Sequence, residues 1–378
     1  MIRASVAIVG GGVSGVFTAH YLVELGLRDI VVIEKNYLGS GSTFRCATGI
    51  RASFTSREHV ELMKYSVDEW LRLSNIYGFN YLRGGYVWLL SNEEELERFK
   101  QYVSFQNKHG IPTRIIDPPT IKELVPPIRE EEVYAGVHDP LAGKADPFKA
   151  VLNTAYKLME KGVRFYTRTR ALRLLVSRDK VYGIETNRGV VVADNIVLAT
   201  GYGTKELLKT INVKIPLENI PHHALITEAF KEAFKPLLVD WATASYIVQT
   251  FYGGFLMGTD IPEKPDTPLI NRLRFLYKIT RVWTRYFPWL SNVNILRYWT
   301  GYYVNTPDHH PILGPIEEYE NLYIAAGFSG HGFMIAPATG TAIAHWIIDG
   351  KPYPEIAGNL KLERFKKGRL VKELAVFG

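Results

Sequence analysis

The sequence contains one cysteine, Cys46, among 378 residues. A single cysteine cannot close an intramolecular disulfide, and it excludes zinc sites built from cysteine pairs. Any metal would have to be bound by histidines and carboxylates. The adjacent His309 and His310 lie in a turn context before Pro311, so we expect no metal there. Glutamine occurs only three times, and this shortage of thermolabile side chains is typical of a thermophile.

Long apolar runs are also missing. No run approaches the roughly 20 residues that span a bilayer, and the N-terminus lacks the apolar segment of a signal peptide. We therefore expect a cytoplasmic protein that is not transmembrane, while the basic stretch 361–374 leaves open a peripheral position at the inner membrane face. With 47% apolar and 22% charged residues, the chain is typical of globular proteins. Its net charge of +7 is scattered, which argues against a nucleic-acid partner.

The clearest signal lies in the first forty residues. An apolar run of strand length, Ser5–Val9, precedes the GxGxxG pattern of Gly10–Gly15, and residues 17–27 are amphipathic with a helical period. A second apolar run, Ile30–Ile33, ends at Glu34. This order is typical of dinucleotide binding, because glycines let the backbone approach a pyrophosphate and the acid bonds a ribose. Nicotinamide and flavin dinucleotides both carry that ribose, so the motif does not choose between them.

Three later segments also have the composition of ligand-binding segments. The stretch Tyr37–Arg51 is rich in small and hydroxyl residues and is suited to wrapping a ligand with its backbone. The segments Val197–Gly203 and Ala325–Phe333 each look like a buried strand that ends in glycine. With the first motif, these junctions indicate one extended ligand that crosses one sheet.

These residues resemble the D-amino-acid-oxidase-like flavoproteins, a family that includes sarcosine oxidase and glycine oxidase. The resemblance covers essentially the whole chain. It rests on GGGVSG with Glu34, GSGSTFRCATGIR, GKADP, VLATG, GYYVNTPDHHPILG and AAGFSGHGF. Within the family the sequence is most similar to the β subunits of archaeal dye-linked L-proline dehydrogenases.

The resemblance implies an α/β fold in two domains. A discontinuous, Rossmann-like FAD-binding domain would comprise 1–83, 141–215 and 314–378, and an α+β substrate-binding domain with an antiparallel sheet would comprise 84–140 and 216–313. Local patterns agree with it. They predict helices over 58–77, 93–109, 334–348 and 361–374, a helix opened by Asp146 and Pro147 that ends near 161, and strands near 84–90, 163–167, 171–176 and 181–186.

Carried over residue by residue, the resemblance implies FAD contacts from the glycine motif, from the acid after it and from the later junctions. The implied residues are Gly10, Gly12, Val13, Ser14, Gly15, Glu34, Lys35, Gly41, Ser42, Thr43, Arg45, Thr48, Gly49, Ile50, Ala171, Ala199, Thr200, Gly201, Gly327, Phe328, Ser329, Gly330, His331, Gly332, Phe333 and Met334. The family's covalent cysteine maps to Gly301, and its FMN-tethering histidine would fall near 145–147, so neither tether is present. We expect non-covalent FAD and leave FMN at a subunit interface open.

Arg51 matches the family's carboxylate-binding arginine, and a planar guanidinium can bind a carboxylate through two hydrogen bonds. An amine pocket is implied over the flavin, although ordinary core packing is an equal alternative for each aromatic residue in it. No general base stands out. The implied pocket residues are Tyr246, Tyr252, Trp299, Tyr303 and His331.

Monomeric sarcosine oxidases carry a lysine where Met334 stands, and its absence favours a dehydrogenase. We expect an FAD-dependent enzyme that oxidises a secondary amine or imino acid by hydride transfer to flavin N5. L-Proline is the first candidate substrate, and its product would be pyrroline-5-carboxylate. The expected partners are a second flavoprotein subunit and an artificial dye or quinone-type acceptor. Two alternatives stay open: a sarcosine, glycine or D-amino-acid oxidase that forms hydrogen peroxide, and a non-catalytic flavoprotein subunit of an electron-transfer complex.

Overall fold

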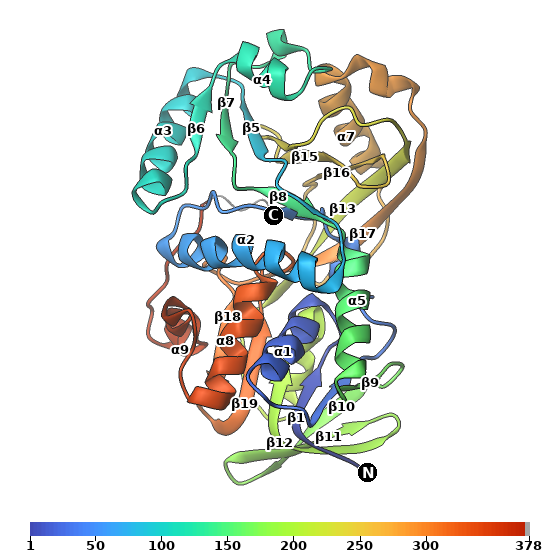
Figure 1. Cartoon of the computed structure of the whole chain (residues 1–378), viewed down its shortest axis with the longest axis vertical. Helices are drawn as coiled ribbons and strands as arrows, with labels where there is room; N and C mark the ends of the chain where they lie inside the picture. The colour runs from blue at the N-terminus through green and yellow to red at the C-terminus, as the bar shows by residue number, and fades with distance from the viewer. Residues whose placement is uncertain (375–378) are drawn as a thin grey trace.

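A computed structural model describes residues 1–374 of the chain (Figure 1). Two eight-stranded sheets lie in the two halves of the molecule, and the long helix α2 (Arg57–Tyr77) crosses between them. This is the expected mixed α/β architecture. Residues 375–378, the end of the predicted FAD-binding domain, lie outside the described residues.

The first sheet, in the lower half of Figure 1, has five parallel strands at its centre. In hydrogen-bonded order its strands are β10 (Ala171–Ser177), β11 (Lys180–Thr186), β12 (Gly189–Leu198), β1 (Ile2–Val9), β2 (Ile30–Ile33) and β9 (Arg164–Tyr166), and β19 (Tyr319–Ala326) joins β12 to β18 (Ile312–Ile316). Of these, β1, β2, β9, β12 and β19 are parallel. The ends of β1, β12 and β19 that lead into the site, and all of β2, are apolar and buried because both faces of the sheet are covered there.

Helices cover one face of this sheet. They are α1 (Val13–Glu24), α5 (Pro147–Glu160) and α8 (Ala336–Asp349), and α2 packs over them. Helix α1 begins four residues earlier than predicted, because Gly12 is its N-cap residue and the helix starts directly at the glycine motif. The predicted cap of α5 is confirmed: the Asp146 carboxylate accepts hydrogen bonds from the backbone N–H groups of Phe148 and Lys149 at 3.0 and 3.1 Å.

The second sheet is antiparallel except where β14 pairs with β5. In hydrogen-bonded order its strands are β17 (Ile295–Asn305), β13 (Glu218–Ala229), β16 (Gly254–Thr259), β15 (Ser245–Gln249), β14 (Leu237–Asp240), β5 (Tyr86–Leu90), β7 (Ala135–Asp139) and β6 (Arg114–Ile116). Three helices pack against strands of this sheet: α3 (Glu93–Lys108), α4 (Pro118–Leu124) and α7 (Leu273–Tyr286). A small sheet of β3 (Gly49–Ile50), β8 (Gly143–Ala145) and β4 (Tyr81–Leu82) lies beside α2.

The remaining elements are short. They are α6 (Thr204–Lys209), α9 (Glu363–Lys366) and the 3-10 helices Thr43–Arg45, Glu130–Glu132, Gly201–Gly203, Pro288–Asn292 and Glu355–Leu360. The helix predicted over 361–374 was therefore wrong except for one turn, because residues 369–374 form no regular secondary structure and bury Glu373. Within residues 1–374, no helix has the length and apolarity to cross a membrane.

Three strands of the first sheet end at one edge, and this edge positions the site. Val9 of β1 lies opposite Leu198 of β12, which in turn lies opposite Ile324 of β19. Because the three strands are parallel, the residues that follow them emerge side by side. This confirms that the three strand-to-glycine junctions belong to one sheet.

Candidate cofactor and substrate site

One cavity lies between the strand ends of the first sheet and the inner face of the second. It encloses about 1820 Å³, including its opening to solvent. The first sheet contributes the residues after β1, β2 and β12, while the second contributes side chains from β5, β13, β15 and β17. One compartment therefore spans both halves of the molecule.

The glycine motif forms one end of the cavity. Gly10 has a φ of +114°, and a Cβ atom there would lie 2.2 Å from the carbonyl oxygen of Ala199. A Cβ atom on Gly15 would lie 2.0 Å from the carbonyl oxygen of Gly10. Gly12 is the N-cap residue of α1 and has no side chain, and the Val13 N–H donates to the Thr43 hydroxyl at 3.1 Å, so the positive end of the helix dipole is presented to the cavity. This arrangement suits a pyrophosphate.

Glu34 stands at the end of β2 and lines the same cavity. Its carboxylate is buried, and it accepts hydrogen bonds from the backbone N–H groups of Gly11 at 2.9 Å and Asn36 at 2.8 Å. These contacts fix the carboxylate beside the glycine motif, where an acid bonds the ribose of a dinucleotide.

Thr48 gives an independent sign of a ligand. It has a φ of +64°, which is rare for a β-branched residue, and it lines the cavity. Its hydroxyl is buried and has no hydrogen-bond partner among residues 1–374. A buried hydroxyl without a partner is costly, so a polar ligand group at this place would stabilise it. Together with the glycine cradle, it shows that these residues fit an extended dinucleotide such as FAD.

The structure brings most of the predicted FAD residues to this cavity. Those that line it are Gly10, Gly12, Val13, Ser14, Glu34, Lys35, Gly41, Ser42, Thr43, Arg45, Thr48, Gly49, Ala199, Thr200, Gly201, Phe328, Gly330, His331, Gly332, Phe333 and Met334. The others, Gly15, Ile50, Ala171, Gly327 and Ser329, lie outside its lining. Ala171 lies at the start of β10 beside Thr186, and Ser329 is fully buried where its hydroxyl accepts a hydrogen bond from the Thr306 backbone.

Arg51 is held rigidly in the cavity wall. Its guanidinium carbon lies 3.7 Å from the centre of the Phe54 ring and 5.0 Å from that of Trp88. Its Nη1 atom donates a hydrogen bond to the carbonyl oxygen of Ser53 at 2.6 Å. Burial lowers the pKa of Arg51 to about 10, which still leaves the guanidinium charged at neutral pH. A buried, fixed cation in a cavity is suited to a carboxylate.

A histidine and an aspartate line another part of the cavity. The Nδ1 atom of His222, on β13, lies 2.8 Å from a carboxylate oxygen of Asp260. The imidazole stacks on Tyr303 with 3.8 Å between ring centres. The Nε2 atom of His222 is buried and has no partner among the described residues. Asp260 therefore fixes the ring so that Nε2 is available to a ligand.

The remaining wall is aromatic and uncharged. Burial raises the pKa values of Tyr86, Tyr246 and Tyr303 well above the usual range, so all three stay as neutral phenols. Burial also lowers the pKa of His331 well below its ordinary value, which leaves this ring neutral at pH 7. The wall has a low dielectric constant and disfavours a charged amine.

Two predicted pocket residues lie elsewhere. Tyr252 is 60% exposed in the turn between β15 and β16, and its hydroxyl donates to the Asp146 carboxylate at 2.5 Å. Trp299 donates to the carbonyl oxygen of Arg45 at 3.2 Å and does not line the cavity. Conversely, the structure adds wall residues that the sequence did not single out for the pocket: Tyr86, Trp88, Asp260 and Tyr302. The sequence signal available for them was only an alternation of apolar and polar residues along strands.

Known proteins resemble this chain over most of its length. Residues 5–346 match the sequence profile of the family described as FAD dependent oxidoreductase. The chain is 26% identical over 377 residues to the sarcosine oxidase subunit beta of Rhizobium meliloti, covering 97% of this chain and 90% of that one.

Solved structures show the same fold. The crystal structure of L-proline dehydrogenase from P. horikoshii superposes with a TM-score of 0.94 at 39% identity, covering 98% of this chain and all of that one. Glycine oxidase from Bacillus cereus ATCC 14579 superposes with a TM-score of 0.86 at 22% identity, covering 95% of this chain and 98% of the oxidase. The second likeness concerns the fold alone.

Proposed function

This chain belongs to the FAD-dependent oxidoreductase family that acts on amines and amino acids, and we propose that it is a dehydrogenase of a secondary amine or imino acid, with L-proline first. One observation carries the proposal: a single cavity joins a dinucleotide cradle to a wall with a buried arginine, a His–Asp pair and neutral phenols. Similarity to the L-proline dehydrogenase of P. horikoshii supports proline as the substrate.

The reaction removes a hydride and a proton from the substrate. In L-proline the bond between the ring nitrogen and the adjacent CH2 group becomes a C=N bond, which gives pyrroline-5-carboxylate. FAD, when bound, supplies the two-electron acceptor for the hydride at its N5 atom. The residues of this chain bind the substrate, orient it and take up the proton.

In this proposal Arg51 binds the substrate carboxylate and His222 receives the amine proton at Nε2. Asp260 holds the opposite ring nitrogen of His222, which keeps Nε2 as the acceptor. The neutral phenols of Tyr246 and Tyr303 exclude water and favour the uncharged amine, which is the reactive form because it has a free electron pair on nitrogen.

We expect FAD to leave the chain when the protein is denatured. Gly301 lines the cavity at the position of the family's covalent cysteine and carries no tether. Burial raises the pKa of the Cys46 thiol to about 12, so this rival attachment residue is not a thiolate. After acid precipitation, all flavin should be found in the supernatant and should run as FAD in chromatography. Flavin that stays on the precipitated chain contradicts this prediction.

The substrate assignment is tested by anaerobic reduction. We expect L-proline to bleach the visible flavin band faster than sarcosine, hydroxyproline or a D-amino acid, because its ring presents a secondary amine and a carboxylate together. A protein that no amine of this panel reduces would instead be a non-catalytic flavoprotein subunit.

The electron acceptor is a separate question. Dye reduction that far exceeds hydrogen peroxide formation supports the dehydrogenase, whereas equal rates support the oxidase alternative. Similarity to a chain named as a subunit beta supports a second flavoprotein subunit as the physiological partner. FMN at such an interface stays a prediction.

A further inference from the structure

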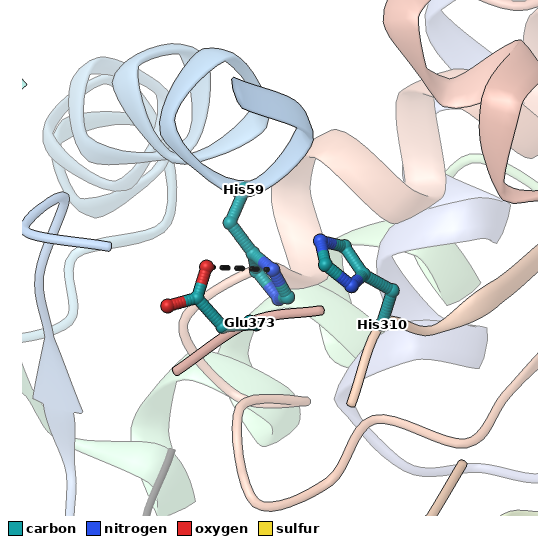
Figure 2. A group of neighbouring side chains, drawn as sticks. All are labelled: His59, His310 and Glu373. Carbon is teal, nitrogen blue, oxygen red and sulfur yellow. Dashed lines mark ion pairs between the residues drawn. The ribbon is translucent and has the colours of Figure 1, made fainter. Parts of the chain in front are cut away.

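Behind the wall of the cavity, three buried side chains from distant parts of the sequence meet. His59 belongs to the first turn of α2, His310 to the loop between β17 and β18, and Glu373 to the segment after α9. Each is at most 2% exposed. One ligand atom from each lies within 4.8 Å of the other two, and Figure 2 shows the side chains pointing toward one another.

The position of His310 fixes which of its nitrogens faces the cluster. Its Nδ1 atom lies 3.0 Å from the carbonyl oxygen of Asp308, which can only accept, so Nδ1 carries the hydrogen. The Nε2 atom then presents a lone pair. The Asp308 carboxylate is itself held by Arg364 at 2.8 and 3.0 Å. A ring in which one nitrogen donates to a fixed carbonyl while the other presents its lone pair is the usual arrangement of a metal-binding histidine.

The ligand atoms of the cluster converge on one hydroxyl, that of Ser56. The Ser56 hydroxyl lies 2.8 Å from His310 Nε2 and 2.7 Å from a carboxylate oxygen of Glu373, but its one hydrogen can serve only one of them. The Nδ1 atom of His59 lies 3.6 Å from the same carboxylate oxygen, the contact dashed in Figure 2. A cation placed among the three side chains would be bound by the His310 and Glu373 lone pairs and, with the hydrogen of His59 on Nε2, by the lone pair of its Nδ1 atom.

The carboxylate is oriented as a ligand would be. Oε1 of Glu373 accepts from the backbone N–H and the hydroxyl of Thr55 at 2.9 and 2.5 Å, and Oε2 accepts from the backbone N–H of Ser56 at 2.9 Å. Two ligand atoms on a tetrahedral ion with bonds of about 2.0–2.2 Å are about 3.4 Å apart. The 3.6 Å between His59 and Glu373 is already close to this separation, so a small inward movement of His310 completes the set.

We propose that His59, His310 and Glu373 bind one divalent first-row transition-metal ion, of the Zn²⁺ or Fe²⁺ type, beside the Ser56 hydroxyl. Two imidazole nitrogens and one carboxylate oxygen suit such ions, whereas Mg²⁺ and Ca²⁺ prefer oxygen ligands alone. The ion links the C-terminal segment to the start of α2. It lies outside the cavity lining, although the His59 ring is within 5.4 Å of the ring of His331, which lines that cavity.

The test uses the full FAD-loaded chain. After dialysis against a chelator, the protein is equilibrated in parallel with Zn²⁺, Fe²⁺ without oxygen, and Mg²⁺, and bound metal is measured by mass spectrometry. We expect one equivalent of Zn²⁺ or Fe²⁺ per chain, no Mg²⁺, and a higher melting temperature with the metal. His310→Gln and Glu373→Gln should weaken binding more than about tenfold, while the control His109→Gln, in α3's C-cap, should bind like the wild type.

Two results overturn the proposal. One is wild-type protein that binds no transition metal, in which case a proton shared by His310 and Glu373 holds the cluster together. The other is metal that stays bound when His310 or Glu373 is replaced. If a variant fails to fold, X-ray absorption of the zinc-loaded wild type decides instead: two imidazoles and a carboxylate oxygen support the site, and a sulfur ligand or a single imidazole refutes it.

Discussion

Arg51→Ala is expected to lower kcat/KM for L-proline by more than about tenfold, because it removes a charged partner of the substrate carboxylate from a desolvated wall. The Arg51 guanidinium is buried between Phe54 and Trp88, so its position before binding is already fixed. Arg51→Lys should mainly raise KM, since a point charge on a flexible stem replaces a planar fork. Steady-state kinetics with an artificial dye as acceptor measures both variants.

Two controls separate this role from damage to the fold. Arg57 lies six residues later on the exposed surface of α2, where it pairs with Glu61, so Arg57→Ala should leave the kinetics unchanged. Pyrrolidine has the ring and the amine of proline without its carboxylate. If Arg51 contacts the carboxylate, the loss caused by Arg51→Ala should largely disappear with pyrrolidine. An equal loss with both substrates, or unchanged kinetics with FAD retained, contradicts the assignment.

The dinucleotide end of the site was predictable because its signals are local. Gly10, Gly12 and Glu34 belong to one strand–helix–strand unit, in which the sequence spacing itself dictates which atoms meet. The later junctions, after β12 and β19, were predictable for a related reason: parallel buried strands end at one edge, and a short stretch after each strand lines the cavity.

The residues at the substrate end of the site were not predictable, because they are brought together by strand pairing between distant parts of the chain. Trp88 reaches the wall because β5 pairs with β14, placing it opposite Val239 about 150 residues away. Asp260 follows β16, and its contact with His222 requires the register of β13 against β16. Tyr252 was expected in the pocket, yet Thr250 and Gly253 form the tight turn of a hairpin there and place Tyr252 in solvent.

The sequence patterns also did not predict that Glu373 is buried. It lies in a basic, charged stretch that we interpreted as a solvated terminal helix, and charged residues are seldom buried without partners. The structure buries it because Thr55 and Ser56 offer backbone and hydroxyl donors to its carboxylate. These donors are more than 300 residues away in the chain, so no local pattern could have indicated them.

Gly10→Ala is expected to abolish FAD binding. Its backbone has a φ of +114°, and the added methyl carbon would lie 2.2 Å from the carbonyl oxygen of Ala199. That oxygen cannot retreat easily, because the N–H of Ala199 donates to the carbonyl oxygen of Val9 at 2.8 Å and thereby fixes β12 against β1. The two strands must separate at the very edge where the cofactor cradle is built.

Gly26 provides the matched control for this variant. It follows α1, has a φ of +96°, and an added Cβ atom there would meet nothing within 4 Å. Gly26→Ala therefore has only the cost of a left-handed backbone, about 1–2 kcal/mol, and should keep its FAD. The ratio of flavin to protein absorbance and the melting temperature of both variants measure the difference. Gly10→Ala protein that is as yellow and as stable as Gly26→Ala would show that the close approach of β1 and β12 is not what holds the dinucleotide site together.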